Sequence, residues 1–327
     1  MKTVVSTVPE SRFRKYQVFF PGDWTVKYVD VPYTDEQLIE ACKDVNFLFV
    51  GSIHQVSAEV IEKCSHLKMI HVEGVGFDKV DVAKAKELGI PVCNNRAVNN
   101  GAVAEHTIGL ILAAMRRTAL CNEQLYTIGY SACKAEHLAK GQHELAGKTV
   151  GLIGGGAIGR EVAKRLAGWD CRICYYDVFR LSAEMEQALK MEYMELEDLV
   201  AAADIISLHV PVLENTYHMI NRERIARMKD GAILINTARG EIVDQEALVE
   251  GLEAGKIVAA LDTIYPEPPA EDHPVLNLSA EAKKRLVLTP HVAGMTDEAF
   301  TRMLINAIAN FERVCRNEKP VNVVNGV

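Results

Sequence analysis

The sequence predicts an α/β protein with two domains, a doubly wound parallel sheet and a smaller α/β domain. Three observations support this prediction. The chain has 327 residues, enough for two domains of ordinary size. Short apolar runs alternate with helical patterns along most of its length, which is typical of parallel sheets whose strands are joined by helices. A glycine-rich turn near mid-chain follows a strand and opens a helix, and it starts a second β/α series.

The first β/α series is followed by a long apolar helix at about 101–118. Apolar runs predict its strands, and segments that begin with Asp or Ser predict its helices. Polar turn material is expected from the end of the long helix to about Gly147. The predicted strands are 45–51, 67–74 and 90–95, and the predicted helices are 35–43, 57–64 and 81–89.

The second series starts at Lys148 and contains six apolar runs. Six strands with helical crossovers make one doubly wound domain. A final helix at about 296–316 follows, and its apolar pattern is expected to return it to the first domain. The predicted strands are 148–153, 171–176, 204–210, 232–237, 257–262 and 285–290, and the helices are 157–168, 182–190, 221–229 and 244–254, the last capped by Asp244.

Composition narrows the possible partners. Lys and Arg number 36 against 44 Asp and Glu, and the resulting net charge of -8 argues against a broad nucleic-acid surface. No apolar run approaches the roughly 18 residues of a membrane span. The N-terminal segment has no apolar signal region, and the eight cysteines are typical of reduced thiols, so a cytoplasmic location is expected. The pair Cys171 and Cys174 is interpreted as structural.

The sharpest local signal is the segment 148–166, KTVGLIGGGAIGREVAKRL. Gly154, Gly156 and Gly159 have the spacing that permits a tight turn, close approach to a pyrophosphate and close helix packing. The helix that follows would present free amides to phosphate oxygens. Asp177 ends the next strand, 18 residues after Gly159, where a carboxylate can bind ribose hydroxyls. The pattern predicts a dinucleotide site, although flavin and S-adenosylmethionine folds share the turn.

Ionisable residues follow the later strands of the second series, at the edge where ligands of such sheets bind. Arg239 offers a planar fork of donors for a carboxylate or carbonyl oxygen. His291 can exchange a proton near neutral pH, and Glu267 can hold its ring and favour the charged form. These three residues are the predicted catalytic set. The other nine histidines show no metal-ligand spacing of the His-x3-His kind, so no zinc site is expected.

At this point the sequence resembles the D-isomer-specific 2-hydroxyacid dehydrogenases, from about Val45 to the C-terminus. The matching blocks occur in the family's order and are GVGFDKVD (74–81), GIPVCNNRAVNNGAVAEHTIGLILAAMRR (89–117), LIGGGAIG (152–159), INTARGEIVDQEAL (235–248), AALDTIYPEPP (259–269) and LTPHVAG (288–294). The resemblance implies a flavodoxin-like substrate domain of residues 1–101, completed by 296–327. It also implies a Rossmann NAD-binding domain of residues 102–295 and a homodimer in which the long helix packs across the two-fold axis.

The resemblance also implies roles for single residues. Arg239 would bind the substrate carboxylate and keto oxygen, Glu267 and His291 would form the proton-donating pair, and backbone at Val75 and Gly76 would hold the carboxylate. NAD would be the cofactor and Asp262 would reach the amide side of the nicotinamide. The residues expected to contact the cofactor are Gly154, Gly156, Ala157, Ile158, Gly159, Asp177, Val210, Pro211, Thr216, Thr237, Ala238, Asp262 and Gly294.

The implied reaction is the NAD-dependent interconversion of a small 2-oxo acid and its D-2-hydroxy acid. The loops 51–57 and 71–78 contain no Arg or Lys, and Glu73 adds a negative charge, so a non-phosphorylated substrate is expected. Arg96 lies near the hinge and is the one cation whose position could overturn this expectation. The alternatives are a phosphoglycerate dehydrogenase type, a phosphite oxidase, and a catalytically weak NAD-sensing corepressor.

Overall fold

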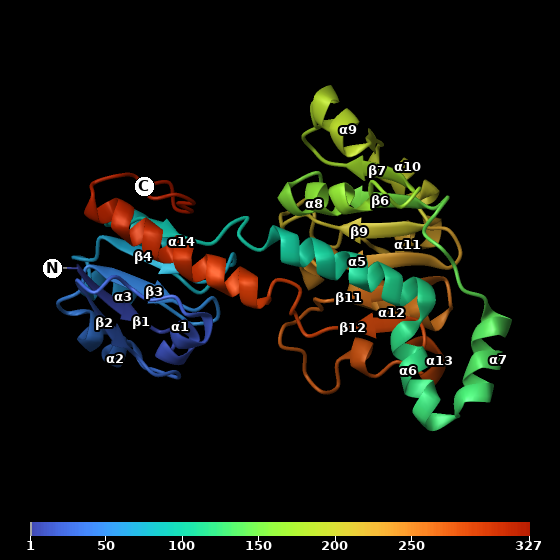
Figure 1. Ribbon diagram of the computed structural model, residues 1–327, viewed down its shortest axis with the longest axis horizontal. Helices are drawn as coiled ribbons and strands as arrows, with labels where there is room; N and C mark the ends of the chain where they lie inside the picture. Colours follow the sequence, from blue (N-terminus) through green and yellow to red (C-terminus); the bar gives the residue numbers. More distant parts are fainter. Residues whose placement is uncertain (1) are drawn as a thin grey trace. The chain divides into compact units, whose positions relative to one another are not determined.

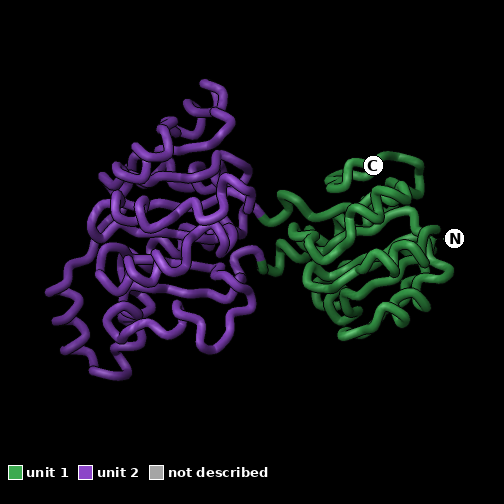
Figure 2. The backbone as a smooth tube through the Cα atoms, turned by 180° about the vertical axis from the view of Figure 1, so that it is seen from behind, with its two compact units in different colours: residues 1–99, 295–327 green, residues 100–294 purple. Residues whose placement is uncertain are grey.

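The computed structural model describes residues 2–327, and the chain forms two compact units (Figure 2). Unit 1 comprises residues 1–99 and 295–327, and unit 2 comprises residues 100–294. Each unit is a parallel sheet with helices on its faces (Figure 1), which confirms the predicted α/β class. Across residues 2–327, no helix has both the length and the apolar character that a bilayer span requires.

Unit 1 is built on a five-stranded parallel sheet in the order β2-β1-β3-β4-β5, which is the flavodoxin-like order. Every residue of β3 and β4 is buried, as expected where helices cover both faces of a sheet. The strands are β1 Lys2–Ser6, β2 Trp24–Tyr28, β3 Phe47–Val50, β4 Met69–Val72 and β5 Val92–Cys93, and the helices are α1 Glu10–Tyr16, α2 Asp35–Cys42, α3 Ala58–Lys63, α4 Val82–Glu87 and α14 Asp297–Cys315.

The long helix α14 belongs to unit 1 and covers one face of its sheet. Thr296 caps it by accepting a hydrogen bond from the Ala299 amide. Its Phe311 is fully buried, and its ring centroid lies 5.0 Å from that of Phe47 in β3. The C-terminal segment of the chain therefore completes the core that its first hundred residues begin.

Unit 2 is built on a seven-stranded parallel sheet in the order β12-β11-β10-β9-β6-β7-β8. The order reverses between β6 and β9, which is the point where doubly wound sheets bind ligands. The strands are β6 Thr149–Ile153, β7 Arg172–Tyr176, β8 Met191–Tyr193, β9 Ile205–Leu208, β10 Ala232–Asn236, β11 Ile257–Leu261 and β12 Leu286–Leu288. The helices are α5 Asn100–Arg116, α6 Thr118–Thr127, α7 Tyr130–Lys140, α8 Ala157–Leu166, α9 Ala183–Leu189, α10 Leu196–Ala202, α11 Arg222–Arg227, α12 Gln245–Glu253 and α13 Ala280–Lys283, with 3-10 turns η1 Gly240–Ile242 and η2 Pro274–Leu276.

Two expectations about unit 2 are wrong. The sheet has seven strands rather than six, because the short edge strand β8 lies beside β7. The segment after α5 is not polar turn material but a helical hairpin of α6 and α7 (Figure 1). Gly129 and Gly141 bracket α7 with positive φ angles of 80° and 71°, so both glycines mark the ends of a helix.

Candidate active site

The glycine turn between β6 and α8 is shaped for close approach of a ligand. Gly154 has φ of 113°, and a side chain there would meet the His209 carbonyl. A side chain at Gly159 would overlap the Gly154 carbonyl, so both positions require glycine. Nothing crowds Gly156, and no hydrogen bond within residues 2–327 uses the Ala157 or Ile158 amide. The start of α8 therefore offers free donors where a phosphate can approach.

Asp177 lies beside this turn, directly after β7. Its carboxylate accepts hydrogen bonds from the Gly155 amide at 2.7 Å and the Phe179 amide at 3.1 Å. The neighbouring cation, Arg180, pairs with Glu186 through contacts of 2.9 and 3.1 Å. No basic side chain within residues 2–327 pairs with the Asp177 carboxylate, so it is available to bind ribose hydroxyls.

The loop after β9 holds the next group of predicted residues. Thr216 is buried, and its hydroxyl donates to the Pro211 carbonyl at 2.6 Å and accepts from the Leu213 amide at 2.7 Å. Val210 and Pro211 are less buried and lie at the turn's edge. In this structure Thr216 therefore shapes the loop, while Val210 and Pro211 are the members of this group that a ligand can reach.

The segment after β10 presents Arg239. Asn236 fixes the backbone there, because its amide group donates to the Arg239 carbonyl at 2.8 Å and its oxygen accepts from the Ala238 amide at 2.9 Å. Thr237 is buried and exchanges a hydrogen bond of 3.0 Å with Thr107 of α5. The Arg239 guanidinium donates to the Ala238 carbonyl at 2.7 Å, and no carboxylate in residues 2–327 pairs with it. A half-buried arginine without an acidic partner is prepared for an anionic ligand.

The segment after β12 carries His291 in an unusual backbone conformation. His291 has φ of 53°, in the left-handed region that non-glycine residues rarely adopt, and such strain persists only where the surroundings impose it. Asp262, which directly follows β11, holds the backbone of His291 in this conformation. Its carbonyl accepts from the His291 amide at 2.8 Å, and its carboxylate oxygens accept from the Val292 amide at 3.0 Å and the Ala293 amide at 2.9 Å. Asp262 is buried, so here it holds the loop of His291.

His291 and Glu267 form the proton-exchanging pair that the sequence predicted. The Nδ1 atom of His291 lies 2.6 Å from an oxygen of Glu267. A carboxylate can only accept, so Nδ1 carries a proton and Nε2 is the atom left to exchange one with a ligand. Both side chains are partly exposed, with 37% of the His291 side chain and 45% of the Glu267 side chain accessible. Two loops that are 24 residues apart in sequence thus meet at one group.

Unit 1 carries the predicted carboxylate-binding segment after β4. Asn94 donates to the Val75 carbonyl and Asn95 donates to the Glu73 carbonyl, each at 2.6 Å. Within residues 2–327, no hydrogen bond uses the Val75 or Gly76 amide, so both can donate to an anion. The loop is pinned by its neighbours because a side chain at position 74 would overlap Ser52.

The structure adds one cation that the sequence analysis missed. Arg12 of α1 reaches the same segment and donates to both oxygens of Glu73, at 2.7 and 2.6 Å. Burial raises the pKa of Glu73, and the Arg12 charge opposes that rise. Burial and the Arg12 charge also lower the pKa of His54, which exchanges a hydrogen bond of 2.7 Å with Thr7. The signal in the sequence was only an arginine in a charged helix, and nothing there identified its partner.

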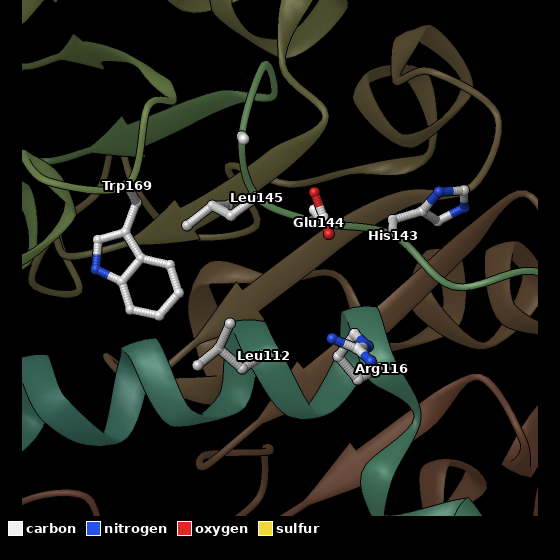
Figure 3. Close-up of a pocket in the computed structure, with 7 residues that line it drawn as sticks. Leu112, Arg116, His143, Glu144, Leu145 and Trp169 are labelled. Carbon is white, nitrogen blue, oxygen red and sulfur yellow. The ribbon is translucent and has the colours of Figure 1, made fainter.

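A separate pocket of about 240 Å³ lies in unit 2, at the end of the sheet where β6 and β7 begin (Figure 3). It is lined by residues that precede β6 and β7 and by the C-terminal part of α5. Arg116 on its wall already donates to Gln142 at 2.9 Å. None of the predicted site residues lines this pocket, so it is not a candidate for the reaction site.

The glycine turn and Asp177 fit a dinucleotide, because the cradle excludes side chains and the acid lies free of a basic partner. Arg239 and His291 suit proton exchange at an oxygen beside a carboxylate. We therefore class the protein as a nicotinamide-dependent dehydrogenase.

Comparisons with known proteins agree. Residues 108–293 match the sequence model of the D-isomer specific 2-hydroxyacid dehydrogenase, NAD binding domain. The chain is 40% identical over 297 residues to a glyoxylate reductase of Thermofilum pendens, covering 90% of this chain and 86% of the relative. It is 42% identical over 274 residues to a hydroxypyruvate reductase of Thermotoga maritima, covering 84% and 86%. A structure of D-lactate dehydrogenase from Aquifex aeolicus, complexed with NAD and lactic acid, superposes with a TM-score of 0.82 at 29% identity, covering both chains fully (100% and 100%).

The chain belongs to the D-isomer specific 2-hydroxyacid dehydrogenase family. It is an NAD-dependent oxidoreductase that interconverts 2-oxo acids and D-2-hydroxy acids. The family, the reaction class and the cofactor expected from the sequence are therefore confirmed. The roles of the individual site residues remain predictions that rest on the geometry above.

Proposed function

We propose that the protein reduces a small, non-phosphorylated 2-oxo acid, with His291 as the proton donor, Glu267 as its positioning residue and Arg239 as the anion-binding residue. The observation that carries this proposal is the contact of 2.6 Å between His291 and Glu267. Arg239 belongs to the same unit and has no acidic partner within residues 2–327. Residues 154–159 and Asp177 would hold the cofactor, whose reduced nicotinamide supplies a hydride when bound.

The residues would divide the remaining work. Arg239 would bind the substrate carboxylate through its planar fork and stabilise negative charge that develops on the keto oxygen. The amides of Val75 and Gly76 would add donors for the carboxylate. His291 would transfer the proton on Nε2 to that oxygen, while Glu267 holds Nδ1 and stabilises the ring's orientation. In the reverse direction His291 would take the proton from the hydroxyl group.

The charges of unit 1 favour a substrate without a phosphate. Arg12 is neutralised by Glu73 at 2.6 Å, and the lowered pKa of His54 makes its imidazole neutral near neutral pH. Arg96 is exposed and forms no ion pair within residues 2–327, so it is the cation that would have to bind a phosphate. A phosphate would otherwise lack the arginine partners that such groups require. The relatives named glyoxylate reductase and hydroxypyruvate reductase support the same class of substrate.

The test is the rate of NADH oxidation with glyoxylate, hydroxypyruvate, pyruvate, 2-oxoisocaproate and phosphohydroxypyruvate. We expect the highest kcat/KM with one of the first three compounds. An Arg96→Gln variant serves as the control, since it should leave glyoxylate reduction unchanged. A kcat/KM for phosphohydroxypyruvate that exceeds the others and falls in Arg96→Gln would refute the proposal and favour the phosphoglycerate dehydrogenase type.

We further propose that the protein is a homodimer and works in the cytoplasm. Helix α5, expected from the sequence to pack across a two-fold axis, buries its apolar side chains within unit 2 against α8, β10 and β11. The α6–α7 hairpin instead exposes apolar side chains, so it is the better-supported contact surface. These are Leu125, Tyr126, Ile128, Tyr130 and Leu138, with 44%, 85%, 46%, 70% and 72% of their surface accessible. Light scattering of the wild type and of Tyr126→Glu tests the dimer.

The proposal of a cytoplasmic location rests on the eight free cysteines, which favour a reducing compartment.

A further inference from the structure

Two cysteines and a histidine meet between α6 and α7, outside the site described above. Cys133 and His137 lie four residues apart on one face of α7, and Cys121 faces them from α6. The two sulfur atoms are 3.9 Å apart, and a ring nitrogen of His137 lies within 4.8 Å of both. Cys133 and His137 are buried, with 2% and 6% of their surface accessible. The expectation of no zinc site rested on histidine pairs and overlooked this Cys-x3-His spacing.

The hydrogen bonds around His137 decide which of its nitrogens is free. Lys140 pairs with Glu136 at 3.0 Å, and Glu136 accepts from the amide nitrogen of Gln124 at 2.9 Å. The amide oxygen of Gln124 therefore faces the Nε2 atom of His137, at 2.9 Å. Since that oxygen can only accept, Nε2 carries the proton and Nδ1 carries a lone pair. Metal-binding histidines are oriented in the same way, by a partner on the nitrogen that does not bind.

The free nitrogen of His137 is the observation that asks for a ligand. Nδ1 is buried and has no hydrogen-bond partner within residues 2–327. An unpaired buried acceptor destabilises the fold, so such groups are rare without a function. A disulfide between Cys121 and Cys133 would leave this nitrogen unpaired, whereas a metal ion bound to all three groups would satisfy it.

The spacing of the donors also fits one metal class. Tetrahedral zinc with Zn–S bonds of about 2.3 Å places its two sulfur ligands about 3.8 Å apart. The observed separation of 3.9 Å matches this, and a histidine nitrogen within 4.8 Å of both sulfurs needs to move by no more than about 1.5 Å to reach a Zn–N bond length. Two thiolates and an imidazole are borderline-soft donors, which favours Zn²⁺ over Mg²⁺ or Ca²⁺.

We propose that Cys121, Cys133 and His137 bind a zinc ion, with a water molecule as the fourth ligand, and that this ion links α6 to α7. The thiolate, not the thiol, is the form of cysteine that binds a metal. Binding therefore releases protons as the thiolates form. The ion also connects the two helices of the hairpin. This link matters because the exposed apolar side chains of the hairpin do not pack in the core of unit 2.

The experiment titrates the reduced, chelator-treated full-length protein with Zn²⁺, and with Co²⁺ as a spectroscopic probe. We expect one ion per chain, sulfur-to-cobalt charge-transfer absorption, proton release and a melting temperature that rises with Zn²⁺ concentration. Cys121→Ser, Cys133→Ser and His137→Gln should abolish tight binding. Gln124→Ala, which leaves all three ligands in place, should weaken it about 10–100-fold.

Cys171→Ser is the matched control, because it removes a half-buried cysteine of the same unit that lies outside the cluster. It should bind Zn²⁺ as the wild type does, and NADH binding reports that each variant is folded. Wild-type binding no tighter than that of Cys133→Ser overturns the proposal, as does a Cys121–Cys133 disulfide in a protein whose reduced form ignores Zn²⁺. An unchanged affinity in Gln124→Ala contradicts the assigned role of Nδ1.

Discussion

Replacing Asp262 by Asn tests how the loop of His291 is held. Both carboxylate oxygens of Asp262 are in use, one by the Val292 amide and the Thr289 hydroxyl, the other by the Ala293 amide. An asparagine offers one oxygen and one NH2 group. In either orientation of the asparagine side chain, its NH2 group faces the Val292 amide or the Ala293 amide. That backbone amide then loses its acceptor.

The cost follows from the bonds that are lost. An unmet buried amide costs about 1–3 kcal/mol, and the remaining bonds weaken because the acceptor is no longer charged. Relief of the buried charge offsets part of this loss, so we expect the free energy of unfolding to fall by about 2 kcal/mol. The strained backbone of His291, at φ of 53°, would then relax. A displacement of about 1 Å at a reacting group can cost about 10²-fold in rate, and we expect a loss of kcat of that size.

The assay is the steady-state reduction of the best 2-oxo acid by NADH, together with chemical denaturation. Asp244→Asn is the matched control, because a single oxygen of Asp244 accepts both the Glu246 and Ala247 amides and asparagine retains it. That control should change stability by less than about 0.5 kcal/mol and leave kcat unchanged. If Asp262 acts through His291, its substitution adds little to the loss in His291→Ala. An unchanged kcat in Asp262→Asn, or fully additive losses in the double variant, would refute this reasoning.

Further substitutions test the other groups. Arg239→Lys should lower kcat/KM about 10²-fold, because an ammonium cannot reproduce the fork, and a loss below threefold would argue against the assignment. Asp177→Asn should lower the preference for NADH over NADPH about tenfold, measured as the ratio of the two kcat/KM values. An unaltered ratio would remove Asp177 from cofactor selection. Burial lowers the pKa of His71 to about 4, below its ordinary value, so the unfolded chain takes up the proton first as the pH falls. Stability is therefore full above about pH 7 and lost toward about pH 4, and His71 should account for about 2 kcal/mol between about pH 7 and pH 5. Between about pH 7 and pH 5, the free energy of unfolding of His71→Gln should therefore fall by about 2 kcal/mol less than that of the wild type, as measured by denaturation. Equal falls in the two proteins would contradict the assignment.

Much of the fold could be predicted because strong signals coincide with buried elements. The runs that became β6, β9, β10 and β11 are mostly apolar, and the glycine turn needs its glycines for steric reasons that hold in any chain. The first three elements of unit 1 carried weaker signals. Helix α1 buries only Phe13, and β2 is a mostly exposed edge strand. The α6–α7 hairpin was missed because its exposed apolar side chains give α6 no clear amphipathic period.

The candidate site was predictable where the chain order places residues at neighbouring strand ends. Glu267 and His291 follow β11 and β12, and they do meet. Tertiary contacts that the sequence does not encode locally could not be foreseen. Thr237 directs its hydroxyl to Thr107 of α5, and Asp262 supports the loop of His291 with its carboxylate. Arg12 comes from a helix far from the loop whose charge it balances.

The most direct test of the assigned chemistry is the single-turnover rate of 2-oxo acid reduction in His291→Ala, measured with NADH bound beforehand. General acid catalysis is typically worth about 10²–10⁴-fold, so the rate should fall by that factor while the dissociation constant for NADH stays near that of the wild type. His66→Ala is a suitable control, since His66 belongs to unit 1 and its Nε2 atom contacts the Cys42 carbonyl at 2.8 Å, apart from the predicted site residues. That variant should keep hydride transfer close to normal if it folds. A His291→Ala protein that reduces the same 2-oxo acid at the wild-type rate would show that another group donates the proton.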